Sequence, residues 1–320
     1  MKNRPNNILK LIDLLGTKSF VNGEDIGKEL GVSRASIWKM ISYLRNEGID
    51  IISIKGKGYR LVEPLIFVNE KYIQSQLDMM DLDTNIKVFE SIKSTNLFEY
   101  KLSEKNQFNI CISEKQTDGV GRFKRQWFSP YARNIYMSLR YTLSKDISEL
   151  SGLSLIIAVA VLDSLKEFGI HDDILIKWPN DILYNDAKLC GISMDVRGEV
   201  NSESEITIGI GINVNMPETN PLWTSLQKIT GVYIDRNNLI VLVLKNLFAV
   251  LNDFENNSFK FFLNRFNNYN YLKGKQIGVE SGNKKYSGQC IGVNELGHLL
   301  IDYNNKIISF SSANTSILKK

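Results

Sequence analysis

Apolar residues near the N-terminus recur every three to four positions, which predicts an amphipathic helix. The residues of this stripe are Ile8, Leu11, Ile12 and Leu15. After a break at 16–23, a second, short helix is predicted over 25–30, with Gly31 at its end. Ser33 is a favourable N-cap for a third helix over 34–46. Two helices joined by a short turn with glycine are typical of a helix-turn-helix.

Two short apolar runs follow this helix pair. They span 49–54 and 59–62 and are joined by Lys55-Gly56-Lys57-Gly58, which predicts a β-hairpin with a basic tip. Such a hairpin would be the wing of a winged helix-turn-helix, and Glu63-Pro64 marks a linker after it. We therefore expect an N-terminal winged helix-turn-helix domain over 1–63.

From residue 65 to about 270, short apolar strands alternate with helical patterns. Strands are predicted over 110–113, 135–140, 174–178, 188–196 and 206–213, and helices over 153–168 and 238–266. The longest apolar run, 153–162, is about half a membrane span, so it predicts a buried helix. The alternation predicts a mixed-sheet α/β domain, which we place at 64–270.

The chain changes character from Gly274 onward. Short alternating strands are separated there by turn residues, namely Ser281-Gly282-Asn283, Asn294-Glu295-Leu296-Gly297 and Asn304-Asn305. This pattern is typical of a small β-barrel, which we place at 271–320. The whole chain is therefore expected to be a multidomain α+β protein.

Positive charge is concentrated at one end of the chain. Residues 1–62 hold eleven Lys/Arg and six Asp/Glu, a balance of +5, whereas the whole chain carries +4. A basic segment on a nearly neutral body favours nucleic-acid binding at that end alone.

Composition excludes several other classes of protein. Cys111, Cys190 and Cys290 are too few and too far apart for a disulfide framework or a zinc site, and two histidines argue against a histidine-based metal site. Hydrophobic residues at 43% and charged residues at 23% indicate a folded soluble protein. The N-terminus has no secretory hydrophobic core, so we expect a cytoplasmic protein with no membrane partner.

The strongest local motif is Lys177-Trp178-Pro179-Asn180-Asp181, followed by Lys188-Leu189-Cys190-Gly191-Ile192. A strand ending there would present an amide and a carboxylate, and the returning strand would begin with a lysine. Each residue alone has an ordinary explanation, such as a solvated strand edge or a core tryptophan before a turn. Their combination is uncommon by chance.

Three weaker motifs accompany it. In the segment 119–127, glycines and cations could bring the backbone close to a phosphate, although a basic surface loop is the simpler explanation. Gly209-Ile210-Gly211-Ile212-Asn213 predicts either tight packing or a floor against an apolar ligand chain. Ser94-Thr95-Asn96 could simply cap a helix.

In this order and spacing, the motifs resemble the biotin protein ligase family, specifically its bifunctional members that also repress biotin synthesis genes. The resemblance also includes the winged helix, Gln116, Trp127-Phe128-Ser129-Pro130, the segment 223–227 and the β-rich tail. It implies a biotin/lipoate ligase-like catalytic domain and an SH3-like C-terminal β-barrel. The implied activity is ATP-dependent: biotin and ATP form biotinyl-5′-AMP, and biotin then passes to a lysine of the biotin carboxyl carrier protein of acetyl-CoA carboxylase.

The resemblance implies catalytic roles for Lys188, Arg122 and Asp181. Lys188 would offset the repulsion between the biotin carboxylate and the α-phosphate of ATP. The residues implied on the ATP side are Arg122, Arg125, Asn180, Asp181, Lys188, Asn213 and Trp223. Mg²⁺ is expected to arrive with ATP rather than to occupy a site made by protein alone, with Asp181 as the protein oxygen nearest to it.

Biotin's ureido ring requires both hydrogen-bond donors and acceptors, and its bicycle and tail require apolar walls. The residues implied for biotin are Ser94, Thr95, Asn96, Gln116, Gly119, Val120, Gly121, Arg122, Trp127, Lys188, Gly191, Gly209 and Gly211.

For DNA, the resemblance makes 34–46 the recognition helix. The implied contacts are Arg34, Ser36 and Lys39 on the helix, and Lys55, Lys57 and Arg60 on the wing. The implied partners are operator DNA of biotin genes, the carrier protein, and a second copy of the chain in a homodimer induced by biotinyl-AMP, which acts as corepressor. A helix-turn-helix kept only as an interaction scaffold is the alternative, which the local charge disfavours.

Two departures from the family pattern fall in the glycine loop. Val120 stands where the first arginine is expected, and Lys124 stands where the last glycine is expected. The tail over 315–318 also lacks the arginine that often follows the last strand. These differences predict weaker retention of the adenylate.

Two other functions compete with this hypothesis. A biotin-sensing repressor without catalysis would not need a cation such as Lys188 beside the phosphates. A lipoate ligase-like enzyme would share the architecture, but the motif at 177–181 and the winged helix favour biotin.

Overall fold

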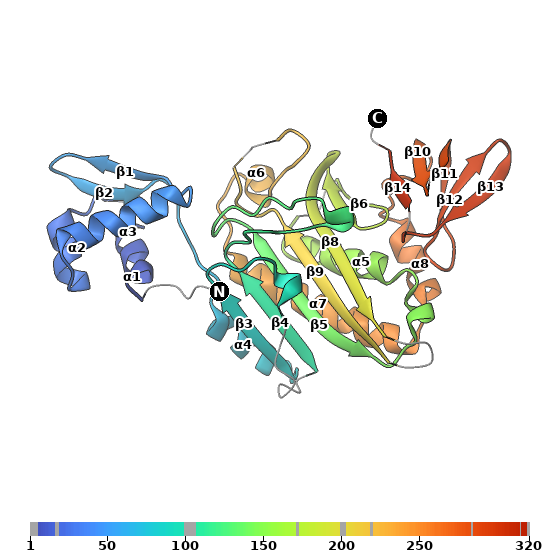
Figure 1. The fold of residues 1–320 in the computed structure, drawn as a ribbon, viewed down its shortest axis with the longest axis horizontal. Helices are drawn as coiled ribbons and strands as arrows, with labels where there is room; N and C mark the ends of the chain where they lie inside the picture. Colours follow the sequence, from blue (N-terminus) through green and yellow to red (C-terminus); the bar gives the residue numbers. More distant parts are fainter. Residues whose placement is uncertain are drawn as a thin grey trace.

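Local capping signals define the N-terminal elements of the protein. The computed structural model describes residues 6–16, 19–98, 107–170, 173–198, 203–217, 220–282, 284–313 and 315–318. Its first elements are α1 (Asn6–Leu15), α2 (Gly23–Leu30), α3 (Arg34–Asn46), β1 (Ile51–Ile54) and β2 (Gly58–Leu61) (Figure 1). Gly31 ends α2 with a φ of 64°, and Ser33 caps α3 by accepting from the Ser36 backbone N–H at 3.2 Å. The predicted helix-turn-helix with a β-hairpin is confirmed.

The central domain is built on a seven-stranded sheet in the order β3-β4-β5-β9-β8-β7-β6. The strands are β3 (Thr84–Phe89), β4 (Phe108–Ser113), β5 (Ile135–Leu143), β6 (Ile174–Lys177), β7 (Asp181–Tyr184), β8 (Ala187–Arg197) and β9 (Ser204–Ile212). Only the pair β3–β4 is parallel, and the other described pairs are antiparallel, so the sheet is mixed as predicted.

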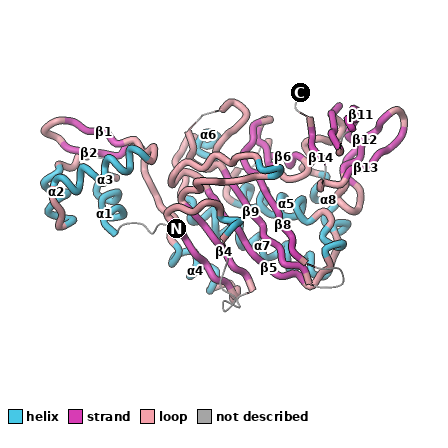
Figure 2. Tube along the Cα trace, viewed as in Figure 1, coloured by secondary structure: helices cyan, strands magenta, loops and turns pink. Residues whose placement is uncertain are grey.

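Helices pack on one face of this sheet, and loops cross the other (Figures 1 and 2). The helices are α4 (Glu70–Asp78), α5 (Leu153–Glu167), α7 (Arg236–Asn256) and α8 (Phe259–Asn267). The single helix expected over 238–266 is wrong, because the chain breaks between α7 and α8. Asn257 lies outside the helical region at φ −130°, and its side-chain amide donates to the Asp253 carbonyl at 2.7 Å.

Helix α7 is long and apolar enough to cross a membrane by length and composition alone. However, 61% of its apolar window is buried inside the protein, where it packs against α5 and α4. It is therefore a central core helix of this domain.

The C-terminal domain is an antiparallel sheet in the order β13-β12-β11-β10-β14. Its strands are β10 (Gln276–Ser281), β11 (Lys284–Val293), β12 (Leu299–Tyr303), β13 (Lys306–Phe310) and β14 (Thr315–Ile317). The predicted small β domain is present. In the described part of the chain β13 and β14 form two separate ends of the sheet, so closure into an SH3-like barrel stays a prediction.

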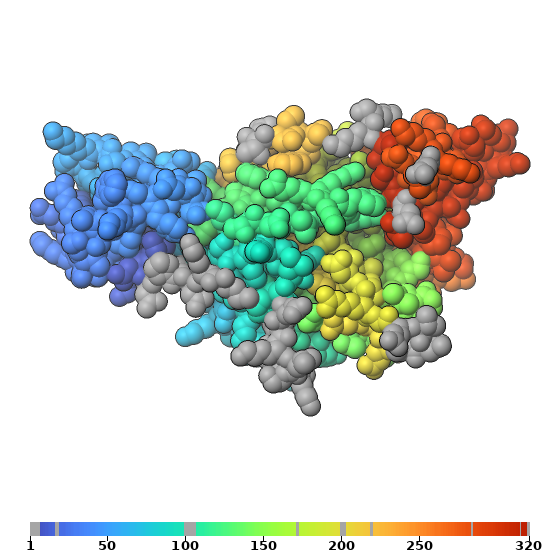
Figure 3. All heavy atoms as spheres, viewed as in Figure 1, coloured from blue at the N-terminus to red at the C-terminus, as the bar shows by residue number. Residues whose placement is uncertain are grey.

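The N-terminal and C-terminal domains lie at opposite ends of the central domain (Figure 3). The junction with the N-terminal domain is polar as well as apolar: Tyr43 of α3 donates to Glu90 at 3.2 Å, and Lys115 pairs with Glu47 at 2.6 Å. Tyr131 of the central domain also donates to Glu90. Side chains of both domains therefore share one buried contact.

Candidate active site and DNA-binding face

A cavity of about 690 Å³ opens on the loop-covered face of the central sheet. Its wall includes nearly every small-molecule ligand residue predicted from the sequence, namely Ser94, Thr95, Asn96, Gln116, Val120, Gly121, Arg122, Arg125, Trp127, Asn180, Asp181, Lys188, Gly191, Gly209, Gly211, Asn213 and Trp223. Gly119 lies behind the wall: a Cβ there would be 2.9 Å from the Gln116 side-chain nitrogen. The fold therefore brings together motifs that are more than 120 residues apart in the chain.

The glycines of β9 make room for larger groups that form the wall. Gly211 lies beside Gly191 of β8, and a Cβ on either would come within 2.7 Å of the Trp127 indole. Gly209 lies beneath Asn96, whose side-chain oxygen would be 2.2 Å from an added Cβ. The alternating glycines thus form a floor on which Trp127 and Asn96 rest.

One end of the cavity is lined by neutral hydrogen-bonding groups. The Gln116 side-chain oxygen accepts from the Thr95 backbone N–H at 2.8 Å. Ser138 Oγ lies 2.7 Å from Thr95 Oγ1 and 2.6 Å from Asn96 Oδ1, and the Asn96 amide donates to Ser193 Oγ at 2.8 Å. Donors and acceptors therefore alternate along a connected chain.

Sequence reasoning did not identify Ser138 and Ser193. Both pair directly with Gly209, one from β5 and the other from β8. Ser193 lines the cavity, whereas Ser138 bonds to Thr95 and Asn96, which line it. Both positions follow from strand register, because residues opposite each other on neighbouring strands point to the same face. A lone serine in a strand gives no such signal.

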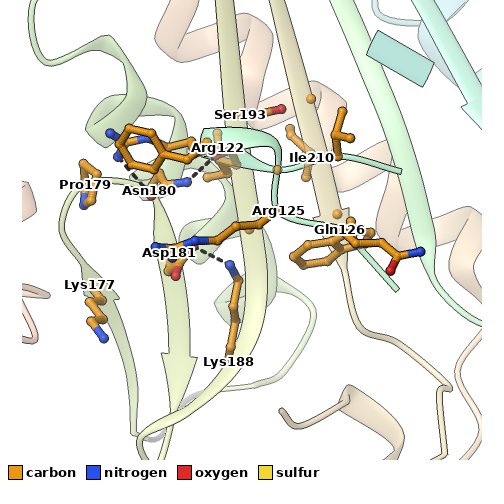
Figure 4. Close-up of a pocket in the computed structure, with 18 of the residues that line it drawn as sticks. Arg122, Arg125, Gln126, Lys177, Pro179, Asn180, Asp181, Lys188, Ser193 and Ile210 are labelled. Carbon is orange, nitrogen blue, oxygen red and sulfur yellow. Dashed lines mark hydrogen bonds and ion pairs between the residues drawn. The ribbon is translucent and has the colours of Figure 1, made fainter. Parts of the chain in front are cut away.

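The other end of the cavity carries charge (Figure 4). Lys188 Nζ of β8 lies 2.7 Å from Asp181 Oδ1 of β7 and 5.1 Å from the Trp127 ring centre. Arg122 donates to Asn180 Oδ1 at 3.5 Å and also to the Ser312 carbonyl of the C-terminal domain. The C-terminal domain therefore holds the loop that carries Arg122.

Burial lowers the pKa of the Arg122 guanidinium below its usual value, and Arg125 lowers it further, whereas Asp181 opposes the shift. A guanidinium remains protonated at neutral pH even so. Arg122 is thus a partly desolvated cation, which interacts more strongly with an anionic ligand than a solvated one does.

The glycine loop has a strained backbone. Phe123 and Lys124 adopt φ values of 55° and 56°, in the left-handed region that favours glycine. The guanidinium of Arg122 lies 5.1 Å from the Phe123 ring centre, and Gly121 donates to the Arg125 carbonyl at 2.8 Å across the turn. Val120, the other departure from the family pattern, is 38% exposed at the cavity wall.

A flat aromatic surface adjoins the charged end. Trp223 and Phe128 stack with ring centres 6.0 Å apart and an interplanar angle of 17°. Backbone hydrogen bonds of Lys188 fix the position of Trp223. The Lys188 N–H donates to the Leu222 carbonyl at 2.8 Å, and the Lys188 carbonyl accepts from the Thr224 N–H at 3.0 Å. Phe128 belonged to a recognised motif, but its partnership with Trp223 was not predicted.

No cluster of three or more His, Cys, Asp or Glu suited to a metal ion occurs among the described residues. At the cavity, Asp181 is the carboxylate next to the loop cations, and it is paired with Lys188. A divalent ion there would need oxygen ligands from a bound phosphate group.

The predicted DNA contacts lie on α3 and on the β1–β2 hairpin of the N-terminal domain. Arg34 and Lys39 on α3, and Lys55 and Lys57 on the hairpin, are exposed. Ser36 is half-buried, and its hydroxyl lies 3.0 Å from that of Ser33. Arg60 stacks over Phe20 at 5.2 Å. The exposed lysines and Arg34 are therefore better placed for a polyanion than Ser36 or Arg60.

Two regions of the chain match known protein families. Residues 88–213 match the biotin/lipoate A/B protein ligase family, and residues 4–60 match the HTH domain. The matched regions contain the sheet with most of the cavity wall and the helix-turn-helix.

Similar proteins extend over nearly the whole chain. The bifunctional ligase/repressor BirA of Escherichia coli is 35% identical over 93% of both chains, and that of Bacillus subtilis is 30% identical over 97% of both. Among solved structures, the biotin protein ligase from Aquifex aeolicus in complex with biotin and ATP is 26% identical, with a TM-score of 0.63. That match covers 74% of this chain and 99% of the other.

Proposed function

The chain belongs to the family of bifunctional ligase/repressor proteins, and from this premise we propose that it is an ATP-dependent biotin protein ligase and a DNA-binding repressor. The enzyme would form biotinyl-5′-AMP from biotin and ATP. It would then transfer biotin to a lysine of the biotin carboxyl carrier protein of acetyl-CoA carboxylase. One observation carries the proposal: a single cavity has a neutral hydrogen-bonding chain at one end, and the Lys188–Asp181 ion pair with Arg122 and Arg125 at the other.

The neutral end suits the ureido ring of biotin. Gln116, Thr95, Asn96 and Ser193 supply acceptors and donors in one connected chain, which suits a ligand that carries both kinds of group. The Trp127 indole N–H is buried over Gly211 and has no acceptor among the described residues.

The charged end suits the first chemical step. A carboxylate oxygen of biotin attacks the α-phosphorus of ATP, the bond to the bridging oxygen breaks, and pyrophosphate leaves. Lys188 lies where it can exchange part of its interaction with Asp181 for the carboxylate and phosphate oxygens, and so stabilise the developing charge. Arg122 and Arg125 would hold phosphate oxygens, while Mg²⁺ arriving with ATP would neutralise phosphate charge beside Asp181.

The second step needs an uncharged amine. The carrier lysine attacks the acyl carbonyl of biotinyl-AMP, an amide bond forms, and AMP leaves with the electron pair of the broken bond. Asp181 is our candidate to accept the amine proton. Trp223, beside Asn213 and Phe128, offers the flat surface that a purine requires.

As a repressor, the protein would bind operator DNA of biotin genes through α3 and the hairpin, with biotinyl-AMP as corepressor and a homodimer as the bound form. The localised charge of the first 62 residues supports this role. Sedimentation with and without biotin plus ATP tests the dimer.

Three finer proposals accompany this function. We place the domains at 1–63, 64–270 and 271–320; a β-bridge from Ile176 to Asn270 supports the second boundary. We also propose that the C-terminal sheet closes as an SH3-like barrel, and that the protein acts in the cytoplasm.

The decisive experiment supplies the protein with ATP, Mg²⁺, biotin and a biotin carboxyl carrier domain. A carrier heavier by one biotinyl group supports the proposal. Pyrophosphate release without transfer would restrict the activity to adenylation, and no release with intact biotin binding would favour a non-catalytic sensor. Preference for lipoate over biotin would identify the lipoate ligase-like alternative.

A further inference from the structure

Trp38 differs from the other tryptophans of the chain in its exposure to solvent. Its side chain is 62% exposed in the second turn of α3, whereas Trp178 is 1% exposed and Trp127 and Trp223 are half-buried at the cavity. Tryptophan is on average highly buried in folded proteins, so exposure of this extent suggests a surface that is covered in a complex.

The direction of Trp38 follows from the contacts of α3. Glu47, just beyond the end of the helix, pairs with Lys115 of the central domain at 2.6 Å, and Ile37, Ile41 and Leu44 are buried in the N-terminal core. Trp38 and Glu47 are nine residues apart, which at about 100° per residue places them on opposite sides of the helix. The indole therefore faces away from the central domain.

The surroundings of Trp38 carry positive charge. Arg34 lies one turn earlier on the same side of the helix, Lys39 follows directly, and both are exposed. Cations beside an apolar ring match a polyanion that also presents apolar groups. The major groove of DNA has this chemistry, because phosphates line it and each thymine projects a methyl group into it.

We propose that Trp38 reads operator sequence by packing its indole against thymine methyl groups in the major groove. This inference rests on the proposed DNA-binding function and deepens it. Ser36, whose hydroxyl is held by Ser33, would contribute little to base recognition, and Arg34 and Lys39 would contact phosphates. Sequence preference would then depend on Trp38, and general affinity on the cations.

The test uses the full-length protein with biotin, ATP and Mg²⁺, and duplexes that this protein selects from a random pool. Wild type is compared with Trp38→Ala and with Leu9→Ala. Leu9 is a matched control because it is an apolar residue on α1, 43% exposed in the same domain. Each thymine of the selected duplex is then replaced in turn by uracil, which removes only the methyl group.

We expect Trp38→Ala to weaken binding to the selected duplex about tenfold, while binding to a scrambled duplex and the salt dependence change little. Uracil at one or two positions should weaken binding by wild type but not by Trp38→Ala. Leu9→Ala should behave as wild type, and the melting temperature of Trp38→Ala should match that of wild type.

Several results would overturn the inference. Equal losses on selected and scrambled duplexes would assign Trp38 to general affinity, and an unchanged uracil profile would exclude methyl contact. A weaker dimer in Trp38→Ala, measured by sedimentation without DNA, would assign the indole to protein contact. If wild type selects no sequence at all, the repressor function itself fails, and the ligase assay is unaffected by that result.

Discussion

Lys188 and Asp181, from neighbouring strands β8 and β7, form an ion pair of 2.7 Å at the floor of the charged end of the cavity. The side chains are 28% and 26% exposed, so the pair is partly in water and can open when a ligand enters. The Lys188 Nζ also lies 5.1 Å from the centre of the Trp127 ring. The residue expected to stabilise the adenylation step is thus held in position before substrates bind.

Lys188→Ala should reduce adenylate formation by a factor of about 100 to 1,000, because removing one preorganised charge contact costs about 3–4 kcal/mol. The rate of pyrophosphate release under single-turnover conditions measures adenylate formation. Lys306→Ala, an exposed lysine on β13, is the matched control and should behave as wild type. Adenylation at a near-normal rate in Lys188→Ala would refute the assignment.

Ser193→Ala should raise the KM for biotin about five- to tenfold and leave kcat nearly unchanged. The Asn96 amide would lose its acceptor at 2.8 Å, and such a bond contributes about 1 kcal/mol or slightly more. Ser287→Ala, at an exposed site on β11, serves as control. A fall in kcat at constant KM would show that Ser193 acts in the chemical step instead.

Lys124→Gly should slow the loss of biotinyl-AMP about fivefold. Lysine at a φ of 56° costs about 1 kcal/mol, and glycine would remove this cost from the loop conformation in which Arg122 lines the cavity. Lys124→Ala removes the same charge but keeps the strain, so its dissociation rate should stay near that of wild type. If both variants slow release equally, charge rather than backbone strain controls the loop.

Val120→Arg should also slow adenylate release, by about tenfold if one charged hydrogen bond of about 1.5 kcal/mol forms. Val120 is 38% exposed at the cavity wall, so a longer side chain has room. The dissociation rate of biotinyl-AMP measures the effect. Equal rates in wild type and variant would mean that another group already closes the loop.

The junction between the N-terminal and central domains should weaken in alkali. Burial, together with repulsion from Glu90 and Glu47, raises the pKa of Tyr43 to about 12. Because this value lies above the unfolded value of about 10, the stabilisation is complete below pH 10 and is lost as the pH rises toward 12. Tyr43 is half-buried, so the effect should be modest.

Urea midpoints of wild type and Tyr43→Phe measure this loss. Wild type should be the more stable below pH 10, and the difference should shrink between about pH 10 and 12. A difference in urea midpoint that stays constant between about pH 10 and 12 would show that ionisation of Tyr43 does not weaken the junction.

The N-terminal domain could be predicted closely from sequence because its signals are local. Ser33 and Gly31 cap and end helices through their own backbone neighbours, and both behave as the sequence predicts. The motif at 177–181 was also recognisable, but β7, which starts at Asp181, was not, because the residues between the motif and Lys188 predict a turn rather than a further strand. The strand β3 and the helix α4 were missed as well.

The cavity could be predicted only in part. Gly209 and Gly211 indicated a floor, yet what rests on it depends on how β5, β8 and β9 align. The contact of Arg122 with Ser312 joins positions 190 residues apart, and no local pattern encodes it. Long-range register and domain packing therefore account for most of what the sequence did not reveal.

The linker that follows the β1–β2 hairpin is held to the central domain by buried hydrogen bonds at Ile66 and Val68. Arg236 donates to the Ile66 carbonyl and pairs with Glu114 at 2.8 Å, with both charged side chains 1% exposed or less, and Glu114 in turn accepts from the Val68 N–H. A linker held by these contacts is rigid, whereas a flexible linker would let the N-terminal domain take many positions relative to the central domain. If two copies bind one operator, this rigid connection predicts a narrow tolerance in half-site spacing, because one inserted base pair turns the second half-site by about a tenth of a helical turn relative to the first.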